Sequence, residues 1–273
     1  MIIAPLLALL AAVQADPCPP AAPPRVQFAP GEQLRFRLDL LGADVGAFDL
    51  SLEPAPVAER KRAAFAVRSR ARTSAFVSTN VGRYEAFATS LLASDLTPLH
   101  YREELDEGQV HKTIDVDFPP KDGELAVVAT KDGNPDPIEL AAGPTARDIL
   151  STLYLLRGQA LDRPVCVDVY AGRKVWRLEG KMAGREQIET PLGKFASLRF
   201  DGTATRLDDP SVKRSAHVWV SDDARRLPLV AIGEVKGKVI RAQLIEATGA
   251  PRATASRKDP APSAPRVGAS IGR

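Results

Sequence analysis

The sequence predicts a mainly β protein, a strongly curved antiparallel sheet or an open or closed β-barrel of about 12 strands with a single helix packed at one mouth. Two observations lead to this fold class. Most of the chain alternates apolar and polar residues, which is the period of a half-buried strand. Only the stretch from Thr145 to Arg157 has the apolar spacing of a convincing helix.

The N-terminal segment has the features of an export signal. Residues 1–15 form an apolar run that is too short to span a bilayer, and Val13 and Ala15 are small enough to precede a cleavage site. We therefore expect a signal peptide over residues 1–15, with a buried N-terminal strand or a misplaced start codon as the alternatives. Residues 16–30 are rich in proline, which favours an extended arm outside any central strand.

A single β-domain is expected over residues 31–249, because no internal linker interrupts the strand pattern. In its first strand, residues 32–41, leucine and phenylalanine alternate with charged side chains. Turn signals follow at residues 42–46, 121–123 and 131–133. The remaining predicted strands cover residues 48–52, 63–72, 84–92, 96–105, 111–118, 125–128, 164–170, 174–181, 195–205, 217–221, 227–232 and 239–245.

The predicted helix begins with Thr145 and Asp148, which approximate a capping box, and ends at Gly158, where a C-terminal cap is expected. Its main apolar face combines Ile149, Leu150, Leu153, Leu156 and Arg157. Leu155 lies nearly opposite this face, and Tyr154 lies at its border. Two interpretations remain open: a plug packed wholly against the sheet, or a lid whose second apolar side meets a ligand.

Charge is concentrated at the C-terminal end of a chain whose net charge is only +3. Residues 250–273 carry five Lys and Arg residues against Asp259 alone, and they lack apolar periodicity, so we expect a disordered basic tail. The remaining residues are electrically balanced. Aromatic residues make up 5% of the chain and show no basic face around them, which argues against nucleic-acid binding. No second apolar run is long enough for a transmembrane segment.

Cys18 and Cys166 are the two cysteines of the chain. Both would remain after signal removal, and an even count in an oxidising compartment favours a disulfide over two unpaired thiols. The alternation of Val165, Val167 and Val169 predicts that these valines face inward, which turns Cys166 toward the proline-rich arm. Lipidation of Cys18 is not expected, because the residues before it do not match a lipoprotein signal.

Motifs for catalysis or cofactor binding are not found. No serine has the flanks of a nucleophile elbow, and no glycine pattern matches a nucleotide-binding loop. The three histidines lie in separate predicted strands without zinc spacing, and an acid/base pair of His217 with Asp222 or Asp223 would require the following turn to fold back. Residues 132–136 resemble the start of a calcium loop but lack its later ligands, so a plain turn is favoured. We expect no cofactor, no metal and no catalytic residue.

Four further segments carry a family resemblance: residues 31–36, residues 148–157, residues 190–195 and residues 218–228. In this order they resemble DUF3108, a bacterial family of exported proteins of unknown function, over about residues 31–244. The resemblance implies an envelope protein with a strongly curved sheet, loosely similar to the half-barrels of periplasmic lipoprotein carriers. Those carriers use several helices as a lid, whereas this chain offers one.

Three functional hypotheses follow. The first is a non-enzymatic envelope protein, located in the periplasm or at the outer-membrane periphery of a Gram-negative bacterium, that holds an apolar or lipid-like ligand in its curved sheet. The second is a scaffold with a solid interior that contacts an envelope protein partner, and an enzyme comes third. The candidate ligand-lining residues are Phe36, Leu38, Phe48, Phe65, Tyr101, Tyr154, Leu155 and Trp219.

Overall fold

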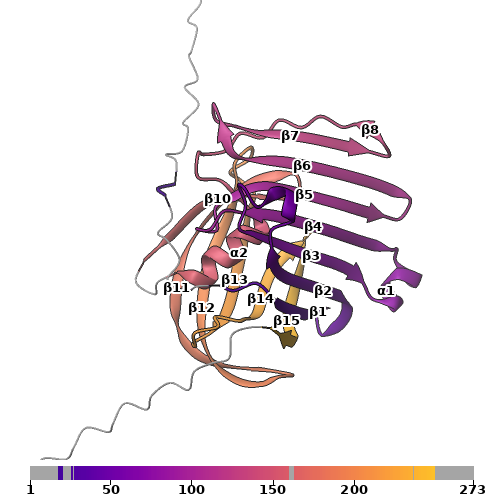
Figure 1. Ribbon diagram of the computed structural model, residues 1–273. Coiled ribbons are helices and arrows are strands. Elements are labelled where there is room, and N and C mark those ends of the chain that lie inside the picture. The colour runs from indigo at the N-terminus through magenta and orange to yellow at the C-terminus, as the bar shows by residue number, and fades with distance from the viewer. Residues whose placement is uncertain (1–17, 21–25, 27, 160–162, 236, 250–273) are drawn as a thin grey trace, which may run out of the picture.

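The fold is one strongly curved sheet of fifteen strands with a helix in its hollow (Figure 1). The computed structural model describes residues 18–20, 26, 28–159, 163–235 and 237–249. The strand order is β8-β7-β6-β5-β4-β3-β2-β1-β15-β14-β13-β12-β11-β10-β9, and the two ends of this order are the open edges of the sheet. The predicted fold class is confirmed.

Two meanders build the sheet. The first contains β1 (Glu32–Leu40), β2 (Ala43–Pro54), β3 (Phe65–Thr73), β4 (Tyr84–Leu92), β5 (Pro98–Glu107), β6 (Val110–Lys121), β7 (Glu124–Lys131) and β8 (Asn134–Pro135). The second contains β9 (Arg147–Asp148), β10 (Val165–Ala171), β11 (Lys174–Thr190), β12 (Gly193–Arg206), β13 (Lys213–Ser221), β14 (Pro228–Val235) and β15 (Lys238–Thr248). Antiparallel pairing of β1 with β15 joins them, with Phe36 opposite Leu244, and β9 pairs with β10 in parallel.

The number of short elements differs from the prediction. The strands β8 and β9 contain two residues each, too few for any alternation to reveal. A second helix, α1 (Ala75–Asn80), and a short 3₁₀ helix, η1 (Val57–Glu59), lie in connections between strands. The hydroxyl of Ser74 caps α1 by accepting a hydrogen bond from the Val77 amide at 3.3 Å. Six residues are too few for an apolar face, so the sequence pattern missed this helix.

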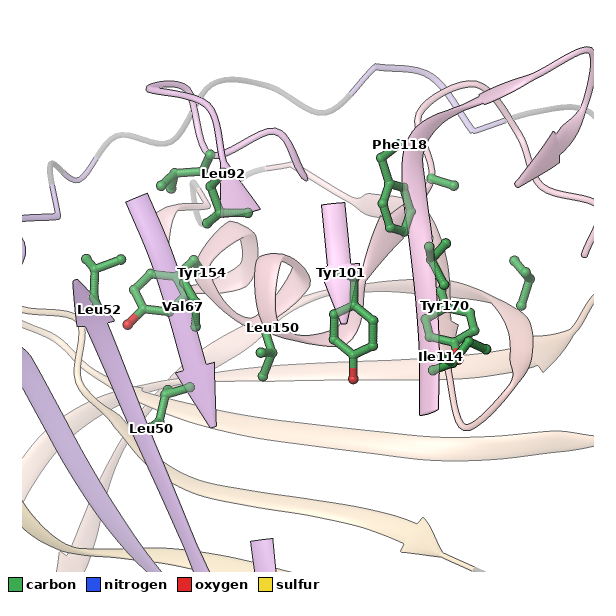
Figure 2. Packing of buried hydrophobic residues seen from close by; sticks show 14 of the residues in the cluster. Leu50, Leu52, Val67, Leu92, Tyr101, Ile114, Phe118, Leu150, Tyr154 and Tyr170 are labelled. Atoms are coloured by element: carbon green, nitrogen blue, oxygen red, sulfur yellow. The ribbon is translucent and has the colours of Figure 1, made fainter. Parts of the chain in front are cut away.

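The core lies on the face of the sheet that packs against the main helix, α2 (Ile149–Gly158), and we call this the inner face. Figure 2 shows Leu50, Leu52, Val67 and Tyr101 gathered around Leu150 and Tyr154 of α2. Strand periodicity explains the arrangement, because alternate residues of each strand point to the same side. Each fully buried side chain of this size contributes roughly 1.5 to 3 kcal/mol.

A second apolar cluster lies on the other side of α2. Leu155 and Leu156 pack there with residues of β10 to β13, among them Phe200 and Val218. The ring of Phe200 lies against the backbone of Gly180, where an added Cβ would come within 2.5 Å of a ring carbon. A larger residue at position 180 would therefore push this ring out of the core.

Helix α2 begins later than predicted. Its N-cap is Asp148, whose carboxylate accepts hydrogen bonds from the amides of Leu150 at 2.8 Å and Ser151 at 3.0 Å. The predicted start at Thr145 is wrong, because the Thr145 hydroxyl donates to the Cys18 carbonyl at 3.4 Å and residues 147–148 form β9. The helix ends at Gly158 with Gln159 as its C-cap.

The predicted faces of α2 are only partly correct. Leu150, Leu156 and Arg157 are buried as expected. Leu155, expected on the outer side, is 2% exposed, whereas Ile149, expected on the buried face, is 46% exposed. Leu153, expected at the centre of the buried face, is only partly buried. The reason is that the curved sheet covers the helix on more than one side, so the side that looked spare in the sequence packs against β10 to β13.

The N-terminal arm is fastened to the sheet as predicted. Cys18 and Cys166 form a disulfide, with a Cα–Cα distance of 5.3 Å across a sequence separation of 148. Val165, Val167 and Val169 are buried on one face of β10, as expected. The predicted signal peptide and basic tail lie outside the described residues.

Candidate functional site

A buried ion pair connects α2 to the first strand of the sheet. The guanidinium of Arg157 donates to both carboxylate oxygens of Glu32, at 2.6 and 2.7 Å. Tyr154, one helical turn earlier, donates its hydroxyl to the same carboxylate at 2.9 Å. Arg157 is fully buried and Glu32 is 3% exposed. The pair is therefore shielded from water, and each charge depends on the other.

Arg157 also has interaction partners other than Glu32 and Tyr154. Its Nε donates to the carbonyl of Arg226 at 2.8 Å, and its Nη2 donates to the carbonyl of Arg225 at 3.2 Å. The guanidinium lies 4.6 Å from the ring centroids of both Phe28 and Tyr154. Burial opposes the positive charge, but the hydrogen bonds and the charge of Glu32 raise the pKa of Arg157 overall. Burial likewise raises the pKa of Tyr154.

Three of the sequence segments that carry the family resemblance meet at this ion pair. Glu32 comes from the first segment, Tyr154 and Arg157 from the second, and the two carbonyls from the turn between β13 and β14. The remaining segment forms the β11–β12 turn, where the Thr190 hydroxyl accepts from the Leu192 amide at 3.1 Å. These segments hold α2 and one corner of the sheet in place, which is a structural role.

Two other buried carboxylates have structural partners too. Asp148 is fully buried, accepts a hydrogen bond from the Ser90 hydroxyl at 2.7 Å, and has its pKa raised by burial. Asp168, 1% exposed, binds Arg177 at 2.9 Å and the amide of Gly143 at 3.0 Å. Neither carboxylate faces solvent, so neither is placed to meet a substrate.

Most of the candidate ligand-lining residues lie on one face of the sheet, but few of them are exposed to solvent. Phe36, Tyr101, Tyr154 and Leu155 are at most 4% exposed and fill the core. Trp219 alternates with Val218 and Val220, so it lies on the opposite face of β13, where its indole donates to Glu186. The partly exposed candidates that border the inner core are Leu38, Phe48 and Phe65.

Beyond α2, the inner face is lined by small residues that sequence reasoning missed. Cross-strand pairs place Ala71 opposite Ala86 and Ser69 opposite Ala88. The same face continues through Leu38 to Ala242 and Ala231. All of these side chains are partly exposed. We call this surface the open inner face, and it consists of Leu38, Phe48, Ser69, Ala71, Ala86, Ala88, Ala231 and Ala242. The alternating alanines of β4 were the sequence signal that could have identified this surface.

Polar groups border the open inner face on its β4–β6 side. Tyr84 pairs with Glu107 across β4 and β5, and Lys112 lies 3.6 Å from the Glu107 carboxylate. Burial raises the pKa of Tyr84 to about 12. An apolar surface with a polar border can hold an amphipathic molecule, because the two parts of such a molecule meet matching groups.

The groups considered for acid/base or metal chemistry take other partners. His217 lies 2.7 Å from Asp201, whereas Asp223 binds Arg225, so the pair with Asp222 or Asp223 does not form. Residues 132–133 make a turn, and residues 134–135 form β8, so residues 132–136 do not make a calcium-type loop. Within the part of the chain that the structure describes, no group of three or more His, Cys, Asp or Glu residues could hold a metal ion.

The outer face carries a shallow groove of about 300 Å³ across β1 to β4 and β15. Its charged side chains are largely ion-paired, for example Arg68 with Glu53 at 3.0 Å. The groove therefore offers little uncompensated charge, and the exposed ring of Phe87 adds apolar surface to its lining. None of the described helices is long and apolar enough to cross a membrane.

Comparison with known proteins identifies the family. The model of DUF3108, a protein family of unknown function, matches residues 35–239. The chain belongs to the DUF3108 family. No functionally curated protein matches it.

Of three similar solved structures, one shares the fold, and the other two are similar only at lower TM-scores. A β-barrel-like protein of the domain of unknown function DUF1849 from Brucella abortus has 11% identity and a TM-score of 0.55, covering 81% of this chain and 98% of that one. A candidate exported protein with a YmcC-like fold from Bacteroides fragilis has 9% identity and a TM-score of 0.33, covering 83% of this chain and 99% of that one. A candidate lipoprotein from Parabacteroides distasonis has 9% identity and a TM-score of 0.34, covering 85% and 100%.

Proposed function

We propose that this DUF3108 protein is a non-enzymatic, exported envelope protein that holds an apolar or amphipathic ligand on its open inner face. One observation carries the proposal: the inner face is filled at the α2 end but lined by small, partly exposed side chains beyond it. Small side chains on a curved sheet leave room for a ligand, which would recover the burial that these residues lack.

The chemistry of the described residues supports a binding role over an enzymatic one. The buried carboxylates of Glu32, Asp148 and Asp168 are each engaged in holding the fold. On the open inner face, the side chains of Ala71 and Ala86 offer no nucleophile or base. The contacts available to a ligand there are therefore mainly apolar, with polar groups only at the border.

The disulfide supports the proposed location outside the cytoplasm. Cys18–Cys166 joins two distant parts of the chain, and such structural disulfides persist in oxidising compartments and are rare in the reducing cytosol. The apolar run at residues 1–15 fits export. Together they favour the periplasm or the outer-membrane periphery.

Native mass spectrometry of the protein purified from its own envelope tests the proposal. We expect a co-purified lipid-like mass, and we expect Ala86→Phe to reduce its amount by filling the open inner face. The matched control is Ala47→Phe, because Ala47 pairs with Arg72 on the outer face of β2, one strand beyond the neighbour of β4. Equal retention by both variants, or no ligand in the wild type and no binding of an added fluorescent fatty acid, would contradict the proposal.

A scaffold is the second candidate, and the solid packing around α2 favours it. Tyr154 and Leu155 are buried between the helix and the sheet, so the α2 end of the interior is filled by the protein's own side chains. If the protein is a scaffold, Ala86→Phe leaves fatty-acid binding at the same background as Ala47→Phe. A protein partner would then be captured by the wild type and by both variants.

A further inference from the structure

Four large apolar side chains project from one end of the sheet. Leu41 is 96% exposed, Phe76 72%, Val81 81% and Val239 58%. Isolated exposed apolar residues are ordinary on protein surfaces, but residues that gather at one end of a fold mark an interaction site. We call these four side chains the apolar rim.

The topology makes these residues neighbours. Phe76 and Val81 lie in the β3–β4 connection, Leu41 lies in the β1–β2 turn, and Val239 is the second residue of β15. The strands concerned are consecutive in the sheet order. The Ser74 amide donates to the carbonyl of Val45 at 2.9 Å, which ties α1 to the β1–β2 connection. Asp39 pairs with Arg241, so Leu41 and Val239, each two residues nearer the end of its strand, lie at the same end of the sheet, where Val239 still pairs with Glu234. Figure 1 shows α1 projecting beyond β3.

The apolar rim lies at the open end of the inner face. Leu38 belongs to that face and lies three residues before Leu41, whereas Val239 lies on the outer side of β15, because Ala242 pairs with Leu38 and Arg241 with Asp39. Helix α2 contacts the other end of the same strands, where Arg157 binds the first residue of β1. The proposed ligand surface therefore ends at the strand ends that carry the apolar rim.

The geometry points to a phospholipid surface as the occupant of the apolar rim. Each side chain stands on a separate tip, which suits the boundary between headgroups and acyl chains, because lipids adapt around single projecting side chains. Lys238, beside Val239, is an exposed cation at one of the tips, whereas Arg83, beside Val81, pairs with Glu85 at 2.7 Å. The charge of Lys238 matches the phosphate groups of the lipids. The nearby exposed acid, Asp44, is engaged with the Gly46 amide at 3.0 Å.

We propose that the apolar rim docks this protein onto a bilayer surface, so that an apolar ligand passes between the bilayer and the open inner face. The role in ligand transfer rests on the proposed function, whereas the docking itself stands on the rim alone. Docking would bring the open inner face to the lipid and leave the end closed by α2 facing away from it.

Vesicle flotation of the full-length exported protein tests the docking. With vesicles of phosphatidylethanolamine and phosphatidylglycerol, we expect the wild type to float and Phe76→Ser with Val81→Ser to lower the partition coefficient at least about tenfold. A tenfold change in the partition coefficient corresponds to a little more than half of the free energy gained when one such side chain is buried. The control is Val57→Ser with Val128→Ser, since Val57 is 77% exposed and Val128 68% exposed outside the rim. Melting curves should be unchanged for both.

Three outcomes would overturn the docking proposal: no flotation of the wild type, flotation of the rim variant at the wild-type level, or an equal loss in the control variant. A change in oligomeric state caused by the rim substitutions, without flotation of the wild type, would assign the rim to a second copy of the chain instead. Ala86→Phe separates the two proposals, because it should abolish fatty-acid binding and leave flotation unchanged. Flotation without fatty-acid binding by the wild type would retain the docking and reject the ligand.

Discussion

Removing one partner of the Glu32–Arg157 pair should destabilise the protein strongly. Arg157→Met leaves Glu32 buried with only the Tyr154 hydroxyl as a partner. An uncompensated buried charge of this kind costs about 3 to 5 kcal/mol, and we expect the upper part of this range. In Glu32→Gln, Arg157 keeps two backbone carbonyls and the rings of Phe28 and Tyr154, so we expect a cost nearer about 3 kcal/mol.

The double variant separates a buried pair from two independent contacts. Glu32→Gln with Arg157→Met leaves no unpaired charge, so its loss of stability should be at least about 2 kcal/mol smaller than the sum of the single losses. Urea denaturation with the disulfide intact measures all three changes. The control is Arg68→Gln, because Arg68 and Glu53 are 48% and 45% exposed and such a pair contributes less than about 1 kcal/mol. Additive single effects, or a cost for Arg157→Met as small as that of Arg68→Gln, would refute the reasoning.

Further predictions concern the helix and the arm. Leu155→Ala should cost about 2 to 5 kcal/mol in urea denaturation, and Leu153→Ala clearly less, because Leu155 is the buried one; the reverse order would contradict the packing of α2. Burial raises the pKa of Asp148 in the folded protein above its ordinary value of 3.8. The stability that this group contributes is therefore fully present below pH 3.8, and it is lost as the pH rises through the pKa of the folded state. Asp148→Asn should therefore gain stability relative to the wild type as pH rises across this window, and a pH-independent difference would argue against the shift. Replacing Cys18 and Cys166 by serine should lower the free energy of unfolding by up to about 5 kcal/mol, since the bond closes a very long loop; an unchanged denaturation midpoint would show that the bond constrains nothing.

The strands were predictable because their apolar residues repeat with period two. The first strand, β1, and the β4 strand were found within one residue of their observed ends, since each has one face in the core. The disulfide was predictable from cysteine count and compartment. The two-residue strands β8 and β9 were not, because only tertiary hydrogen bonds define them.

The candidate site was less predictable than the fold. Large apolar residues such as Tyr101 and Leu155 were chosen as ligand-lining, but size favours complete burial in the core, and that is where they lie. A surface that leaves room for another molecule is marked by small residues instead, as Ala71 and Ala86 show. The exposure of a residue depends on how far the helix reaches along the curved sheet, which no local pattern encodes.

The pairing of β1 with β15 has a consequence for folding. It unites residues more than 200 positions apart at the centre of the sheet, so the two meanders can join only after the last strand has been synthesised. Such long-range pairing slows folding. Gly31 and Gly249 lie next to each other, since a Cβ on Gly249 would overlap the Gly31 carbonyl. A circular permutant that joins these ends and opens between β8 and β9 would make the strand order of the sheet the same as the order along the chain. We expect it to keep the same fold at lower stability, because Cys18 and its disulfide are removed, and to refold faster than the Cys18→Ser, Cys166→Ser variant, which stopped-flow fluorescence would measure.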